Sequence, residues 1–135
     1  MCDHPAVLYV EDEPFSRQVM QMLLVRGLGF KHVTIFEDST DFMTRVENLA
    51  LKPNLIMLDI HMQPFDGFKM LHLLREHHDY RQARIVAVTA SVMNEEIELL
   101  KSAGFDGGIG KPIDQNFLPE FLDRILNGEQ IWHVT

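Results

Sequence analysis

Residues Leu55-Ile56-Met57-Leu58-Asp59 (LIMLD) decide how this 135-residue chain folds. Four consecutive apolar side chains without alternation are typical of a strand that is covered on both faces. Pro53 and Asn54 stand directly in front of this run and separate it from the preceding segment. Strands that are covered on both faces occur in parallel sheets flanked by helices, so LIMLD predicts one strand of such a sheet.

Apolar runs and stretches of helical period alternate regularly on both sides of this segment. We expect strands at Ala6–Val10, His32–Phe36, Leu55–Leu58, Ile85–Val88 and Gly107–Gly110. We expect helices from Pro14 to Gly27, over Thr40–Leu49, Gly67–His78 and Asn94–Ala103, and over a last apolar stripe from Phe117 to Leu126. Five strand–helix units of this kind predict an α/β fold, with a doubly wound five-stranded parallel sheet, five helices and right-handed crossovers.

Local signals mark several of the expected helix ends. The carboxylate of Glu13 suits the N-terminus of the first helix. Asp38 or Ser39 is expected to cap the second helix, and Asn94 the fourth, because short polar side chains accept hydrogen bonds from the first free amides of a helix. Gly104 is expected to end the fourth helix.

Length and composition fit a single domain over residues 1–135, with a core at about 5–127 and a short tail at 128–135. The net charge of −8 argues against nucleic acid and against an anionic membrane surface as partners. The apolar runs are too short to cross a bilayer, and the first residues lack the features of a signal peptide. The single cysteine, Cys2, excludes an intramolecular disulfide, so we expect a cytoplasmic protein.

Polar side chains follow four of the expected strands at the point where each strand ends. They are Glu11 and Asp12 after the first strand, Asp59 after the third, Thr89 after the fourth and Lys111 after the fifth. In open parallel sheets the functional crevice lies beyond the carboxyl ends of the strands. We therefore expect these five side chains to converge on one rim of the sheet.

These groups form a coherent set for phosphoryl transfer. Three carboxylates brought together repel one another and need a counter-charge, and their oxygens suit Mg²⁺ or Mn²⁺. An aspartate can attack phosphorus and form an aspartyl-phosphate. The ammonium of Lys111 and the hydroxyl of Thr89 would each bind a phosphoryl oxygen. Taken singly, each residue also has a structural interpretation, such as a turn aspartate or a surface lysine.

The ordered set Glu11-Asp12, Asp59, Thr89-Ala90 and Lys111-Pro112 resembles the bacterial response-regulator receiver family of two-component signalling, in particular its single-domain, chemotaxis-type members. The segment from Asp59 to Gly67 (DIHMQPFDG) resembles the phosphoacceptor loop of that family. The resemblance covers roughly residues 5–127. It implies a flavodoxin-like fold with strand order 2-1-3-4-5.

The resemblance also implies a role for each site residue. Asp59 would be the phosphoacceptor, and Thr89 and Lys111 would hold the phosphoryl group. The implied metal ligands are Asp12, Glu11 through a water molecule, Asp59 and the backbone carbonyl of His61.

The sequence departs from the family pattern at three positions. Glu11 replaces a frequent aspartate and lengthens the side chain by one methylene. Gln63 intervenes before Pro64 in the phosphoacceptor loop. Gly108 stands where many receivers carry an aromatic residue that rotates inward on activation. Output would therefore use the backbone or loop after Thr89, or another surface.

The function predicted from these residues is that of a stand-alone response regulator. A sensor histidine kinase or a histidine phosphotransfer protein would phosphorylate Asp59. The signal would pass to a downstream protein, or to a second copy in a homodimer, through the fourth helix, fifth strand and fifth helix, roughly residues 93–126. No enzymatic turnover is expected beyond self-phosphorylation from small donors and autodephosphorylation.

Two enzyme or carrier classes share part of this pattern. A Mg²⁺-dependent phosphohydrolase would use the same aspartyl-phosphate, but His61 stands where a second carboxylate would act as acid and base. A flavodoxin-like FMN carrier would need small or hydroxyl residues after Val10, where the chain is acidic. His61 and Ser91 are candidates for tuning the phosphoryl lifetime. The histidines have no ligand spacing, so no transition-metal site is expected.

Overall fold

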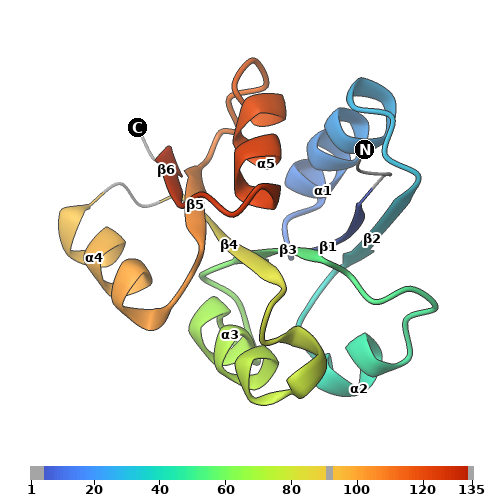
Figure 1. Cartoon of the computed structure of the whole chain (residues 1–135), viewed down its shortest axis with the longest axis vertical. Helices are drawn as coiled ribbons and strands as arrows, with labels where there is room; N and C mark the ends of the chain where they lie inside the picture. The colour runs from blue at the N-terminus through green and yellow to red at the C-terminus, as the bar shows by residue number, and fades with distance from the viewer. Residues whose placement is uncertain (1–4, 91–92, 134–135) are drawn as a thin grey trace.

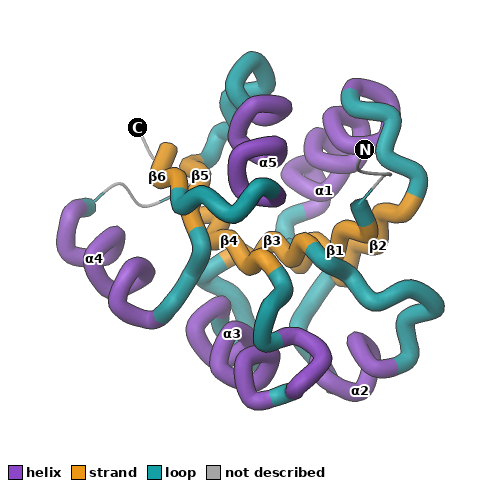
Figure 2. Tube along the Cα trace, viewed as in Figure 1, coloured by secondary structure: helices purple, strands orange, loops and turns teal. Residues whose placement is uncertain are grey.

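The computed structural model describes residues 5–90 and 93–133, whose strands form one parallel sheet (Figures 1 and 2). The strands are β1 (Ala6–Val10), β2 (His32–Phe36), β3 (Leu55–Asp59), β4 (Arg84–Thr89), β5 (Gly107–Gly110) and β6 (Ile131–His133). They are ordered β2-β1-β3-β4-β5-β6, and every neighbouring pair is parallel. The predicted flavodoxin-like order 2-1-3-4-5 is confirmed, and β6 extends it by one strand.

Five α-helices cover the two faces of the sheet. They are α1 (Pro14–Gln21), α2 (Phe42–Glu47), α3 (Gly67–Glu76), α4 (Asn94–Ala103) and α5 (Leu118–Leu126). Met22–Gly27 continues α1 as a π-helical segment, and His78–Tyr80 follows α3 as a 3₁₀ turn, so α3 itself ends before the predicted His78. Figure 2 shows α1 and α5 on one side of the sheet and α2 and α3 on the other. Among the described residues, no helix has the length and hydropathy to span a bilayer.

Buried side chains form one apolar layer on each face of the sheet. On β1, Val7 and Tyr9 pack with α1 and α5, whereas Leu8 and Val10 pack with α2, α3 and α4. Successive strand side chains point to opposite faces, so a strand that is buried on both sides must be apolar at every position. Each such side chain contributes roughly 1.5–3 kcal/mol by leaving water. These two layers hold the strand ends, and therefore the rim, in place.

The start of α3 packs directly against the chain that follows Asp59. A Cβ atom at Gly67 would lie 2.6 Å from Cδ1 of Ile60 and 3.1 Å from the carbonyl oxygen of Asp59, so only glycine fits there. Asp66 caps α3 by accepting a hydrogen bond from the amide of Lys69 at 2.9 Å. The loop between β3 and α3 is thereby fixed at both of its ends.

β6 rests on two adjacent glycines of β5. A Cβ atom at Gly107 would lie 2.6 Å from the carbonyl oxygen of Ile131, and one at Gly108 would lie 2.8 Å from the ring of Trp132. The tail predicted for residues 128–135 therefore contains a strand, and its pairing depends on the missing side chains of β5. Figure 1 shows β6 beside β5 at the edge of the sheet.

The predicted cap of the second helix is wrong. Asp41, in the left-handed conformation with φ 51°, precedes α2 instead. The predicted residues are engaged elsewhere: the Asp38 carboxylate pairs with Arg45 at 2.9 Å, and the Ser39 hydroxyl donates to the carbonyl of Phe65 at 2.8 Å. Both side chains hold loops together and are not available to the helix.

Of the other predicted helix ends, one is wrong and two are confirmed. Asn94 is the first residue of α4 and Met93 is its cap, so the predicted Asn94 cap is wrong by one residue. Gly104 ends α4 with φ 107°, as predicted. Glu13 caps α1 by accepting a hydrogen bond from the amide of Ser16 at 2.7 Å, which confirms its predicted structural role.

Candidate functional site

Side chains from three strand ends lie together at the carboxyl rim of the sheet. The Lys111 Nζ atom lies 2.7 Å from Glu11 Oε1 and 3.5 Å from Asp59 Oδ2. Carboxylate oxygens of Glu11, Asp12 and Asp59 lie within 4.8 Å of one another. Since β1, β3 and β5 run parallel, residues 48 and 52 positions apart reach the same point, as the strand-end pattern predicts.

Glu11 is the most deeply buried charged group of the site, with no exposed surface. Its carboxylate accepts hydrogen bonds from the Tyr9 hydroxyl at 2.7 Å and the Glu13 amide at 3.2 Å, in addition to the ion pair with Lys111. Burial acts to raise the pKa of Glu11, but the hydrogen bonds from Lys111 and Tyr9 outweigh it and lower that pKa. Glu11 therefore stays ionised and anchors the lysine.

Asp59 has the opposite electrostatic environment, although it lies beside the same lysine. Burial, a hydrogen bond to Glu11 and the negative charge of Glu11 raise the pKa of Asp59 from 3.8 to about 7, while Lys111 opposes this shift. Lys111 lies closer to Glu11 than to Asp59, so it offsets the raised pKa of Asp59 only in part. A cation bound beside Asp59 would lower its pKa again.

Thr89 and His61 border Asp59 on the side of α4. Thr89 is fully buried at the end of β4, and its hydroxyl donates to the carboxylate of Glu96 at 3.3 Å. The backbone amide of His61 donates to Asp59 at 3.4 Å, while its ring Nε2 lies 3.0 Å from the same Glu96 oxygen. The amide of Lys111 donates to the Thr89 carbonyl at 2.8 Å, which ties the ends of β4 and β5 together.

Asp12 is the exposed carboxylate of the group. It lines an open cleft of about 630 Å³ together with His61, Met62, Gln63 and Asp66. The cleft exposes the rim to solvent on the side of Asp12. Two buried carboxylates and one exposed carboxylate form an oxygen ligand set that fits Mg²⁺, which keeps several of its waters when bound. The Gln63–Pro64 and Lys111–Pro112 peptides next to the site are both cis.

Glu96 is the site residue that was not predicted from the sequence. It lies within α4 and not at a strand end, so the rule that located the other groups passes over it. Its two acidic neighbours, Glu95 and Glu98, give it no distinguishing local signal. Only the packing of α4 against the rim brings its carboxylate to Thr89 and His61.

Other candidate features lie outside this site. His77, His78 and Asp79 bring possible metal ligands within 4.8 Å of one another, but Lys52 already neutralises Asp79 at 3.0 Å. Ser91, predicted to influence the phosphoryl lifetime, and Cys2 lie outside the described residues.

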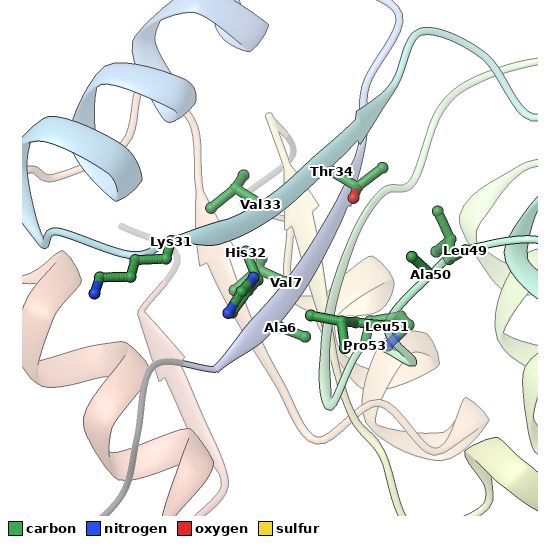
Figure 3. A pocket seen from close by; sticks show the side chains of 10 residues that line it. All are labelled: Ala6, Val7, Lys31, His32, Val33, Thr34, Leu49, Ala50, Leu51 and Pro53. Carbon is green, nitrogen blue, oxygen red and sulfur yellow. The ribbon is translucent and has the colours of Figure 1, made fainter.

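A pocket of about 270 Å³ lies at the opposite end of the sheet (Figure 3). Figure 3 shows that the starts of β1 and β2 and the segment from Leu49 to Pro53 line it. Among the described residues its lining contains Lys31, His32 and Thr34 but no carboxylate, so it lacks the oxygen ligand set of the rim.

A flavodoxin-like sheet with acidic residues, a hydroxyl and an ammonium at its carboxyl rim defines the class of the signalling receivers. The model of the response regulator receiver domain matches residues 7–123, and the chain belongs to this family, which serves two-component systems. Receiver domains are signalling modules, and β6 lies beyond the matched residues.

Sequence relatives include both response regulators and kinases. The nitrate/nitrite response regulator protein homolog of Haemophilus influenzae is 30% identical over 131 residues, which is 97% of this chain and 61% of the relative. The signal transduction histidine-protein kinase BarA of Shigella flexneri is 29% identical over 125 residues, which is 93% of this chain. This chain spans only 13% of the length of that kinase.

Solved receiver structures share the fold. The receiver domain of sensor histidine kinase PA1611 from Pseudomonas aeruginosa PAO1 superposes with a TM-score of 0.79 at 25% identity, covering 93% of this chain and 99% of that one. That receiver holds a magnesium ion in its active site cleft. The chemotaxis response regulator CheY4 of Vibrio cholerae gives a TM-score of 0.80 at 23% identity, covering 91% and 99%.

Proposed function

We propose that Asp59 accepts a phosphoryl group from a phosphohistidine. One carboxylate oxygen of Asp59 attacks phosphorus, the new O–P bond forms, the P–N bond breaks, and the histidine nitrogen leaves with its electron pair. The observation that carries this proposal is the position of Lys111, whose ammonium lies 2.7 Å from Glu11 and 3.5 Å from Asp59. Later attack by water on phosphorus would release phosphate and regenerate the carboxylate.

The phosphoryl group would be held by groups of this chain. The Lys111 ammonium would neutralise one phosphoryl oxygen and the Thr89 hydroxyl would donate to another. Asp12, Glu11 through water, Asp59 and the His61 carbonyl would hold a magnesium ion, which would offset the charge of the carboxylates and of the phosphoryl oxygens. The magnesium-bound receiver of the sensor kinase from P. aeruginosa supports this assignment.

The proposed donor is a sensor histidine kinase or a histidine phosphotransfer protein. The relatives of this chain are response regulators and histidine kinases that carry such a domain, which supports a histidine donor over a small phosphate ester. The single-domain organisation over residues 1–135 and the cytoplasmic location stay predictions.

Phosphorylation would be read through α4, β5 and α5. β6 covers the outer edge of β5, so a partner strand cannot pair there while β6 is in place. Met93, which caps α4, and Leu99 within it are 64% and 60% exposed, and they give this region an apolar surface. We propose that a downstream protein binds this surface, and that a homodimer through α4, β5 and α5 is the second outcome to test.

The direct test is phosphorylation of the whole chain with acetyl phosphate and Mg²⁺, followed by mass spectrometry. The expected result is the addition of one phosphoryl group, which Asp59→Asn abolishes and the control Asp123→Asn, on the exposed side of α5, leaves unchanged. Phosphate on the Asp59→Asn protein would place the acceptor elsewhere. Continuous release of phosphate from small esters would instead identify a phosphohydrolase.

A further inference from the structure

Glu96 connects the phosphoacceptor rim to a helix of the proposed output surface. A single oxygen of its carboxylate lies 3.3 Å from the Thr89 hydroxyl and 3.0 Å from the His61 ring nitrogen. Thr89 ends β4, His61 lies two residues after Asp59, and Glu96 is the third residue of α4. The side chain of Glu96 is 23% exposed, so the contact is partly shielded from water.

The Thr89 hydroxyl is needed at two places. It has one proton to donate, and in this structure it lies 3.3 Å from a Glu96 carboxylate oxygen, within hydrogen-bonding distance. A phosphoryl group on Asp59 would need the same proton for one of its oxygens. Binding of the phosphoryl group therefore competes with the hydrogen bond that joins β4 to α4.

Charge acts in the same direction as this competition. A phosphoryl group adds nearly two negative charges beside Asp59. The rim already contains three carboxylates, and Lys111 lies closest to one of them, Glu11. Glu96 adds a fourth carboxylate on the side of Thr89 and His61, so it repels the incoming group.

We propose that Glu96 is a positioning residue that restrains Thr89 and His61 before phosphorylation, opposes phosphorylation, and releases the start of α4 once Asp59 is phosphorylated. This inference rests on the proposed function of Asp59. It names the element that transmits the signal in a chain with Gly108 at the usual aromatic position, where the Trp132 ring occupies the space above the glycine. Loss of the contact with Glu96 frees the helix that carries Met93 and Leu99.

The test compares Glu96→Gln and Glu96→Ala with the matched control Glu95→Gln, an exposed residue one position earlier in the same helical turn. The probe is beryllofluoride with Mg²⁺ at fixed concentration, a mimic of the bound phosphoryl group. We expect Glu96→Gln to bind the probe about threefold to tenfold more tightly than the unmodified protein, and Glu96→Ala at least as tightly. The control should stay within about twofold of the unmodified protein.

A second background separates the hydrogen bond from the charge. In a Thr89→Ala protein the hydroxyl is absent, so the difference between Glu96→Gln and Glu96→Ala in probe binding should shrink to what the contact with His61 contributes. Hydrogen exchange supplies a readout of α4 itself. Beryllofluoride should increase amide exchange at the start of α4 in the unmodified protein, and Glu96→Ala should show that faster exchange without the probe.

The outcomes distinguish the two proposals. If the unmodified protein does not bind beryllofluoride, the proposed function of Asp59 is wrong. If it binds the probe and the Glu96 variants bind with unchanged affinity, or if α4 exchange is the same with and without the probe, the role of Glu96 is refuted while that of Asp59 stands. Thermal unfolding of each variant checks that the comparison is made on folded protein.

Discussion

The free energy of unfolding of the unmodified protein should fall as pH rises through the pKa of Asp59. In the Asp59→Asn protein this fall should be absent. The pKa of Asp59 is raised from 3.8 to about 7 in the folded protein by burial and by Glu11. Between these values the folded state keeps a proton that the unfolded chain releases, so raising the pH favours unfolding. The stabilisation that the raised pKa of Asp59 gives to the folded state is fully present below pH 3.8 and is lost as pH rises through about 7.

The size of the effect follows from the pKa difference. One proton of difference changes the free energy of unfolding by about 1.4 kcal/mol per pH unit. Between pH 5 and pH 8 the loss therefore amounts to about 2–3 kcal/mol, most of it below pH 7. The lowered pKa of Glu11 acts only below its ordinary value of 4.5, outside this interval. The other ionisable groups are common to both proteins, so their contributions cancel in the comparison.

The assay is urea unfolding of both proteins with a chelator present, at pH 5 and at pH 8. The stability advantage of Asp59→Asn over the unmodified protein should grow by about 2–3 kcal/mol between pH 5 and pH 8. Asp123→Asn serves as the control and should follow the unmodified protein. Adding Mg²⁺ at pH 8 should stabilise the unmodified protein more than Asp59→Asn. A difference that stays constant with pH would refute the electrostatic description of the rim.

Three further predictions concern groups packed around the site. Lys111→Ala leaves the buried carboxylate of Glu11 without its cation, and urea unfolding at pH 8 should show a loss of about 3 kcal/mol. Tyr9→Phe removes the 2.7 Å hydrogen bond to the same carboxylate and should cost about 1–2 kcal/mol in that assay, whereas an unchanged midpoint would contradict it. Gly108→Ala places a Cβ atom 2.8 Å from the ring of Trp132, the single tryptophan, so its fluorescence should shift to the red as β6 is displaced. The same change should cost about 1–3 kcal/mol.

The central sheet could be predicted because strands that are apolar at every position must be buried on both faces, and a parallel sheet between two layers of helices provides that burial. β1, β3 and β4 are buried along almost their whole length, and an uninterrupted apolar run of such length has no solvent face to leave open. The site residues of β1, β3 and β5 followed from the same pattern, because a parallel sheet brings all strand ends to one rim. Chain order alone was therefore enough to bring Glu11, Asp59 and Lys111 together.

What the sequence did not reveal depends on contacts between distant segments. β6 has only three residues, Ile131 to His133, and no pattern of its own. Its signal lay elsewhere, in the adjacent glycines Gly107 and Gly108, which leave room for a neighbouring strand. The cap of α2 was misplaced because Ser39 pairs with the backbone 26 residues away. Such partners are chosen by packing, so local propensity cannot identify them.

The charge balance of the rim links the stability of the domain to its proposed chemistry. Glu11, Asp12 and Asp59 face a single ammonium, so the rim carries an excess of negative charge whenever all three are ionised. The raised pKa of Asp59, about 7, relieves part of this excess when no cation is bound, and a proton on that oxygen would oppose the proposed attack on phosphorus. A divalent cation would displace the proton and generate the nucleophile in the same event. Under the proposed function, the same carboxylate repulsion that lowers stability at high pH would make phosphorylation depend on a cation, and Glu96 would add to the repulsion from the side of α4.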